Sequence, residues 1–417
     1  MAIHPEEVLR IRTFLNSLIQ QLPQGFREVE KQVIIGLRIL PKIAPREKAM
    51  LREFAHKLLL LMREYEASDI EFGGPGSNSM IWLRVYGQKR PLPELGRFSL
   101  DEFSILIQCL LQETQQKQLY KNRSIDFSYV VALPDQPRQR YRATVYFEMG
   151  ELALNMRAIQ TRLRPYESYG FHENVSRTLS LRYNKEGLIL VTGITGSGKT
   201  TTLDAIIDLN NREVEGHIIV LASPIEFIHQ SQKCIIRQRE VGLDTLSFKQ
   251  GVIEALHQDP DIIIIGEMRD PETIMTVLEA ADSGHKVFST LHTASAVESI
   301  ERIIAEMPSL EQDRVRNRLA DTLRCVISQK LVPGVNGKLA LAKEIMIMTS
   351  SVKAAIKNNN LSEVYQMVNE GKQHGMLTME QDLRRLLLEE KISPETAMSF
   401  ANNKRLMEQL LNADIIL

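Results

Sequence analysis

A glycine-rich segment near the middle of the chain has the residue types and spacing of a loop that binds nucleotide phosphates. Its glycines let the backbone curl so that successive N–H groups point inward at phosphate oxygens. Lys199 supplies a mobile positive charge for the β- and γ-phosphates, and Thr200 offers a hydroxyl to Mg²⁺. ATP and Mg²⁺ are therefore expected at Gly193, Ile194, Thr195, Gly196, Ser197, Gly198, Lys199, Thr200 and Thr201.

Hydrolysis of a bound nucleotide needs a carboxylate near the γ-phosphate to hold Mg²⁺ or to orient water. The apolar run 262–265 is followed by a glycine and then by Glu267. Ligands of parallel sheets bind at the carboxyl ends of the strands, so Glu267 is expected to face the nucleotide. The alternative is a solvent-facing acid in a turn. Asp259 and Asp261 precede the run and are expected to form a turn with the proline between them.

Short apolar runs alternate with helical patterns in the second half of the chain. This alternation predicts an α/β fold with a mostly parallel sheet that helices cover on both faces. One helix is expected from Lys199, and another after Asp270, a good N-cap followed by proline. From Ser309 onward the chain is expected to be helical, with capping boxes at 309–312 and 378–381. The expected strands are 188–192, 218–221, 262–265 and 287–290.

The first half of the chain has a different pattern. Apolar residues at helical spacing predict helices in residues 1–65, either as a packed helical cap or as a docking arm for a partner. Beyond them, short apolar runs and glycine turns predict an α+β domain that ends near Arg164. A helix is expected over about 100–120, and the expected strands are 69–72, 81–85, 126–131 and 140–146.

The composition is that of an ordinary globular protein, with 51 Lys and Arg residues against 52 Asp and Glu residues. A net charge near zero provides no field that attracts nucleic acid, so no nucleic-acid partner is expected. Cys109, Cys234 and Cys325 are too scattered for a disulfide framework or a zinc site. No apolar run approaches the roughly 20 residues of a membrane span, and no signal peptide is visible, so a cytoplasmic protein is expected.

Three further segments resemble signature motifs of the secretion and pilus motor ATPases. Residues 259–270 resemble their Walker B segment, residues 284–293 their His box, and residues 239–245 a third signature. The pattern is most similar to the PilT family of type IV pilus retraction ATPases, over about residues 67–402. The resemblance implies a helical N-terminal extension, a PAS-like α+β domain, a RecA-like P-loop ATPase domain and a C-terminal helical region, at residues 1–65, 66–165, 166–330 and 331–417.

The resemblance also implies a homo-hexameric ring with ATP between subunits, and it assigns roles to single residues. Glu226 and Glu267 would share the tasks of orienting water and holding hydrated Mg²⁺, beside Lys199. His285 and His292 would sense the nucleotide, although an isolated histidine usually has a structural role. The candidate arginine fingers, whose alternative is an ordinary surface ion pair, are Arg140, Arg142, Arg237 and Arg239.

The function implied by the resemblance is ATP-driven retraction of a type IV pilus, exerted from the cytoplasm on an inner-membrane platform protein. Where the family has Glu-Asp-Pro-Ile-Glu, this chain has Ala222 and Ser223 before Pro-Ile-Glu226, so two carboxylates are missing. This departure supports a second interpretation, a weakly hydrolysing accessory (PilU-like) ring ATPase that assists a paralogous motor. A pilus-assembly or type II secretion ATPase is the third, although the chain lacks the four-cysteine insert of many such enzymes.

Overall fold

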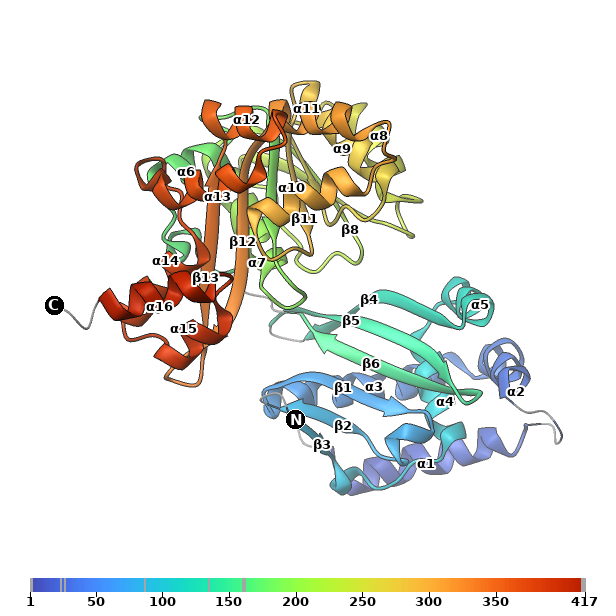
Figure 1. The fold of residues 1–417 in the computed structure, drawn as a ribbon. Helices are drawn as coiled ribbons and strands as arrows, with labels where there is room; N and C mark the ends of the chain where they lie inside the picture. The colour runs from blue at the N-terminus through green and yellow to red at the C-terminus, as the bar shows by residue number, and fades with distance from the viewer. Residues whose placement is uncertain are drawn as a thin grey trace. The chain divides into compact units, whose positions relative to one another are not determined.

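The computed structural model describes residues 3–22, 25, 28–85, 88–133, 136–159 and 163–413. The chain divides into two compact units, residues 1–161 and 162–417. Each unit has its own sheet (Figure 1), and no buried hydrophobic cluster among the described residues is shared between the units. The first unit holds the predicted helical extension together with nearly all of the predicted α+β domain.

The first unit is built on a six-stranded antiparallel sheet in the order β3-β2-β1-β6-β5-β4. Its strands are β1 (Ala67–Gly73), β2 (Trp82–Val85), β3 (Gln88–Pro91), β4 (Ser124–Leu133), β5 (Gln136–Glu148) and β6 (Glu151–Ala158). Its α-helices are α1 (Pro5–Ile19), α2 (Glu28–Ile34), α3 (Pro45–Glu64), α4 (Leu100–Leu110) and α5 (Glu113–Asn122).

The helices of the first unit pack on one face of this sheet (Figure 1). Alternate residues of the strands, such as Ile70 and Phe72 in β1, point into the core because successive side chains of a strand face opposite ways. The apolar stripes of α1 and α3 are buried in the same core, where Phe54 of α3 is fully buried. The N-terminal helices therefore share one core with the sheet, as a packed helical cap would.

The second unit is built on a seven-stranded sheet in the order β13-β12-β7-β11-β10-β8-β9. All neighbouring strands are parallel except β12 and β13, which form an antiparallel hairpin. The strands are β7 (Gly187–Thr192), β8 (Gly216–Ala222), β9 (Cys234–Glu240), β10 (Ile262–Ile265), β11 (Lys286–Leu291), β12 (Leu323–Pro333) and β13 (Leu339–Ile347).

Helices cover both faces of this sheet, as the alternation in the sequence predicted. The helices α6 (Glu173–Leu179) and α7 (Lys199–Glu213) pack on one face. The opposite face is covered by α8 (Phe248–Leu256), α9 (Pro271–Asp282), α10 (Ala296–Ala305), α11 (Gln312–Thr322), α12 (Ser350–Lys357) and α13 (Leu361–Glu370). The far part of the β12–β13 hairpin packs on α14 (Met379–Leu388), α15 (Pro394–Phe400) and α16 (Lys404–Ala413) (Figure 1).

Three expectations about local structure are wrong. Residues 323–333 and 339–347 form strands although everything beyond Ser309 was expected to be helical. Strand β12 pairs with β7, and the pairing of β13 with β12 outweighs the helix-forming Ala, Leu, Lys and Glu residues of β13. The expected helix at 100–120 is two helices, broken between Leu110 and Glu113. The box at 309–312 is absent, since α11 starts after Glu311 without a side-chain cap.

Three predicted helix starts are confirmed, the first being α7, which begins at Lys199. The Asp270 side chain accepts a hydrogen bond from the Thr273 N–H at the start of α9, and Thr378 with Gln381 forms the predicted capping box of α14. Within the residues that the structure describes, every helix is too short or too polar to cross a bilayer. The three cysteines are buried and unpaired.

The substitution Phe54→Ala tests whether the N-terminal helices belong to the core of the first unit. Phe54 is fully buried, and its ring centroid lies 6.2 Å from that of Phe98. Removing the ring should lower the free energy of unfolding by about 3–5 kcal/mol. Trp82 is the single tryptophan of the chain, so its fluorescence reports denaturant unfolding of this unit. The exposed Leu9→Ala serves as the control, and equal unfolding midpoints for both variants would contradict the shared core.

Candidate functional site

The glycine-rich loop connects the end of β7 to the start of α7, the strand–loop–helix order that a phosphate-binding loop requires. Gly193, Gly196 and Gly198 have φ angles of 147°, 81° and 87°, values that side chains disfavour. A Cβ atom on Gly193 would lie 2.5 Å from the Gln329 carbonyl oxygen of β12. The curled backbone therefore depends on glycine at these positions.

The loop also presents polar groups that a triphosphate would satisfy. The Ser197 hydroxyl is buried without a hydrogen-bond partner among the described residues. Buried polar groups are almost always paired, so this orphan hydroxyl fits a site completed by a ligand. The N-terminus of α7 adds its positive dipole end to the loop N–H groups. The residues present thus fit a nucleotide phosphate.

Lys199 folds back over the loop that precedes it. Its ammonium donates hydrogen bonds to the carbonyl oxygens of Gly193, at 2.8 Å, and Ile194, at 3.1 Å. Burial lowers the pKa of Lys199, while the negative charge of Glu267 acts in the opposite direction. The lysine is therefore kept beside the loop, in the electrostatic field of the predicted catalytic carboxylate.

Glu267 follows β10, whose carboxyl end lies between those of β8 and β11. Its carboxylate is mostly buried and contacts two cationic or polar groups of the same chain. Arg269 Nε lies 2.6 Å from Oε1, and His292 Nε2 lies 3.5 Å from Oε2. Glu267 and His292 therefore lie together at the carboxyl ends of neighbouring strands, where the charge of Glu267 acts on Lys199.

The altered acidic segment follows β8 and contains a cis peptide bond between Ser223 and Pro224. Its remaining acid, Glu226, is half-buried. A carboxylate that the sequence analysis did not single out, Glu240, lies opposite Ala222 in the register of β8 and β9. Glu240 Oε2 accepts a hydrogen bond from the Ile225 N–H at 3.2 Å. The segment that lacks two acids therefore has another carboxylate beside it, contributed by a strand that was not predicted.

The two histidines of the predicted coupling pair lie at opposite ends of β11. His292 follows the strand beside Glu267, whereas His285 precedes it, next to Ser283, whose hydroxyl is 3.0 Å from Nδ1. Between them Lys286 is fully buried and donates hydrogen bonds to the carbonyl oxygens of Thr178 and Asn184. Within this chain, only His292 of the pair is at the nucleotide edge of the sheet.

The four candidate arginines differ in how far their own chain already engages them. On β5 of the first unit, Arg140 is buried and donates to the Ser128 hydroxyl, whereas Arg142 is exposed. On β9 of the second unit, Arg239 lies 2.6 Å from the Glu254 carboxylate, whereas Arg237 is exposed on the edge strand. Arg142 and Arg237 therefore have the side chains more available to a neighbouring molecule.

Strand β12 contributes residues that the sequence analysis missed. Gln329 is buried and exchanges hydrogen bonds with the Thr202 hydroxyl in the first turn of α7, at 2.8 and 3.1 Å. The hydroxyls of Ser328 and Thr192 lie 2.8 Å apart beside the loop. Gln329 and Ser328 are about 130 residues away from the loop in sequence, and no motif marks them, because only the pairing of β12 with β7 brings them there.

A Mg²⁺ site fits the exposed Thr200 hydroxyl and Glu267 only together with a nucleotide. Among the described residues there is no group of three or more acidic, histidine or cysteine side chains that could hold a metal alone. Mg²⁺ usually takes one or two protein ligands, substrate phosphates and water. The donor set here matches that arrangement.

Comparisons with known proteins agree with this geometry. The family model of type II/IV secretion system proteins matches residues 126–412. The chain is 37% identical over 327 residues to a twitching motility protein of Neisseria gonorrhoeae, covering 78% of this chain and 85% of the relative. It is 36% identical over 341 residues to the type IV pilus retraction ATPase PilT of Pseudomonas aeruginosa, covering 82% and 96%.

The fold is also similar to a solved structure. The crystal structure of the pilus retraction motor PilT with bound ADP matches with a TM-score of 0.75 at 34% identity. The match covers 85% of this chain and 98% of the solved chain. The similarity thus extends over both units and includes a protein that holds a nucleotide.

The substitution Gln329→Leu tests whether β12 supports the phosphate-binding loop. The substitution removes both hydrogen bonds to Thr202 with little change in side-chain volume. It should lower the free energy of unfolding by about 1–3 kcal/mol. Calorimetric unfolding of Gln329→Leu, Thr202→Val and the double variant measures the coupling between the two side chains. If the double variant loses as much free energy of unfolding as the two single variants together, the two side chains act independently and the proposed support is contradicted.

Proposed function

The chain belongs to the type II/IV secretion system protein family, and on that premise we propose that it is an ATP-hydrolysing motor that powers type IV pilus retraction. One observation carries the proposal. The charge of Glu267 acts on Lys199 of a complete phosphate-binding loop, in a chain that covers 96% of the PilT relative. A twitching motility protein is among the relatives that match over most of their length, and this similarity supports pilus retraction as the function of the motor.

The chain's own residues supply binding and positioning for hydrolysis of ATP to ADP and phosphate. The loop N–H groups and Lys199 hold the phosphates, and Lys199 exchanges the Gly193 and Ile194 carbonyls for phosphate oxygens. Glu226 and Glu267 share the tasks of orienting the attacking water and holding hydrated Mg²⁺. Mg²⁺, held by Thr200 and through water by Glu267, would neutralise charge on the phosphates.

The working form is proposed to be a homo-hexameric ring with ATP at each interface. A ring requires a head-to-tail interface that closes on itself, so each site can receive a residue from the next subunit. Arg142 and Arg237 are the better candidates for that residue, because Arg140 and Arg239 already bond within the chain. We propose that His292, which lies beside Glu267, responds to the charge of the nucleotide, whereas a coupling role for His285 would require a neighbouring subunit.

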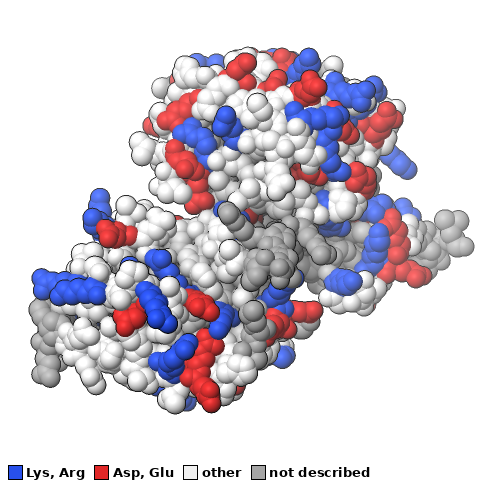
Figure 2. Space-filling view, turned by 180° about the vertical axis from the view of Figure 1, so that it is seen from behind, with Lys and Arg blue, Asp and Glu red and all other residues white. Residues whose placement is uncertain are grey.

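The proposed partner is an inner-membrane platform protein of the pilus, engaged from the cytoplasmic side, with a paralogous motor ATPase as a further partner. Nucleic acid is not a proposed partner. Figure 2 shows Lys and Arg interspersed with Asp and Glu over the described residues of the visible face. Nucleic-acid binding instead needs cationic side chains gathered into a patch or stripe.

A second candidate function is a weakly hydrolysing accessory ring ATPase. The observation that favours it is the loss of two acids at Ala222 and Ser223. With fewer carboxylates beside the γ-phosphate, the attacking water would be oriented less well. Hydrolysis would then be slower, while nucleotide binding would remain. Against this function, Glu240 contributes another carboxyl group beside the same segment.

ATP turnover of purified protein distinguishes the two functions. Lys199→Ala should bind ATP about tenfold more weakly or worse, because a charge-assisted hydrogen bond is lost. Glu267→Gln should bind ATP normally but lower kcat by about a hundredfold. Phosphate release and displacement of a fluorescent nucleotide measure the two quantities. The control Glu301→Gln removes an exposed acid of α10 and should change neither.

Two results would change the assignment. Wild-type turnover equal to that of Glu267→Gln, with intact ATP binding, would favour the accessory function. Equal ATP affinity of wild type and Lys199→Ala would contradict the nucleotide site itself.

Deletion of the gene in its native host tests retraction. Cells should carry excess surface pili and lose twitching movement, because assembled fibres would no longer be withdrawn. Electron microscopy and twitching assays measure both, and complementation with wild type, but not with Glu267→Gln, should restore them. Cells without pili would indicate an assembly motor, and unchanged cells would point to the accessory function.

A further inference from the structure

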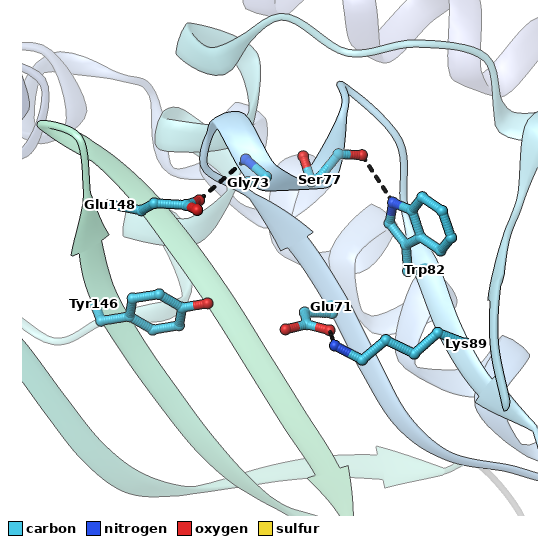
Figure 3. Close-up of a pocket in the computed structure, with 8 residues that line it drawn as sticks. Glu71, Gly73, Ser77, Trp82, Lys89, Tyr146 and Glu148 are labelled. Carbon is cyan, nitrogen blue, oxygen red and sulfur yellow. Dashed lines mark hydrogen bonds and ion pairs between the residues drawn. The ribbon is translucent and has the colours of Figure 1, made fainter. Parts of the chain in front are cut away.

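The sheet of the first unit carries a hollow on the face opposite its helices. The hollow has a volume of about 280 Å³ and lies between β5 on one side and β1, β2 and β3 on the other (Figure 3). Tyr146 and Glu148 border it from β5, and Glu71, Trp82 and Lys89 border it from the opposite side (Figure 3). It lies wholly within the first unit and shares no residue with the nucleotide site.

Small residues create the hollow. In the strand register, Tyr146 of β5 lies opposite Ala153 of β6, and Ala153 lies opposite Gly73 of β1. No large side chain therefore stands beside Tyr146 on this face, and Gly73 forms part of the lining. Trp82, opposite Glu71 in the register, closes the far side, and its indole N–H donates to the Ser77 carbonyl oxygen at 2.7 Å. The rings of Trp82 and Tyr146 thus stand on either side of the hollow.

The charges of the hollow are mainly acidic. The Glu148 carboxylate accepts a hydrogen bond from the Gly76 N–H at 3.2 Å, and a Cβ on Gly74 would lie 2.0 Å from its Oε2 atom. The glycine turn thus makes room for this carboxylate at the rim. Glu71 forms an ion pair with Lys89. Two carboxylates and one lysine leave a net negative charge in the hollow. Burial raises the pKa of Tyr146, and the charges of Glu71 and Glu148 raise it further.

We propose that this hollow binds the guanidinium group of an arginine side chain presented by another protein chain. A planar guanidinium stacks on aromatic rings and donates paired hydrogen bonds to a carboxylate, so it suits Trp82, Tyr146 and Glu148 together. The volume is below the roughly 300–1,000 Å³ of pockets for small molecules, and suits one inserted side chain. This inference goes beyond the motor function and does not depend on it.

Other ligand classes fit less well. An anion would be repelled by the net negative charge of the lining. A metal ion would need more ligands than these, since no group of three or more candidate ligands exists among the described residues. An ammonium group lacks the planar surface that matches two aromatic walls, so lysine is expected to bind more weakly than arginine.

The single tryptophan of the chain makes the test direct, because Trp82 lines this hollow. The full chain is titrated with N-acetyl-arginine methylamide while the tryptophan emission is recorded. We expect a saturable change in emission, and no change with N-acetyl-citrulline methylamide, which is neutral and of nearly the same shape. An equal response to both probes, or no saturable response to the arginine probe, would overturn the proposal.

Matched variants locate the probe. Glu148→Gln should weaken binding by about fivefold, the effect of losing one partly exposed ion pair. Glu71→Gln provides a second variant should Glu148→Gln fold poorly, as judged by circular dichroism. Glu113→Gln removes an exposed acid from the start of α5 and should leave binding unchanged. Equal affinity of wild type and a folded carboxylate variant would refute the site.

A dilution series identifies the source of the arginine. If a neighbouring copy of this chain provides it, assembly at high protein concentration should weaken binding of the probe, because the site is already filled. If a different protein provides it, probe affinity should be independent of protein concentration. Both results support the site and assign its occupant.

Discussion

The close approach of β12 and β11 to Gly193 is the constraint on which the nucleotide site depends. The Gly193 N–H donates to the Leu291 carbonyl oxygen at the end of β11, while the Gln329 carbonyl of β12 occupies the space of a Cβ atom. The loop is therefore fixed on two sides before it turns into α7. His292 follows β11 and lies 3.5 Å from Glu267, which follows the neighbouring strand β10, so the strand that holds the loop also holds this pair of side chains.

The parts of this site that depend on local chemistry could be predicted from the sequence. The loop, the strand before Glu267 and the cap at Asp270 each follow from a few adjacent residues. Gln329 and Glu240 could not be predicted, because each reaches the site only through the pairing of distant strands. Strand β13 was missed for a related reason: its residues favour a helix locally, and its burial between β12 and α14 decides otherwise.

The first unit shows the same division between local pattern and tertiary placement. The apolar stripes of α1 and α3 predicted helices, and their burial against the sheet follows from hydrophobic packing. Whether those helices formed a cap or a free arm depended on contacts such as Phe54 with Phe98, which no local pattern encodes. The hollow beside Trp82 likewise requires the register that aligns Tyr146, Ala153 and Gly73.

A series of polar contacts links the surroundings of Glu267 to the segment between α15 and α16. His292 contacts Glu267, and two residues later the Ala294 carbonyl accepts a hydrogen bond from the Asn402 side chain at 3.2 Å. Lys330 of β12 donates to the same asparagine side chain at 2.6 Å. Lys330 immediately follows Gln329, which bonds to α7. The segment after β11 and strand β12 thus both bond to Asn402, which lies between α15 and α16, so a shift of either one is expected to be felt at this end of the two helices.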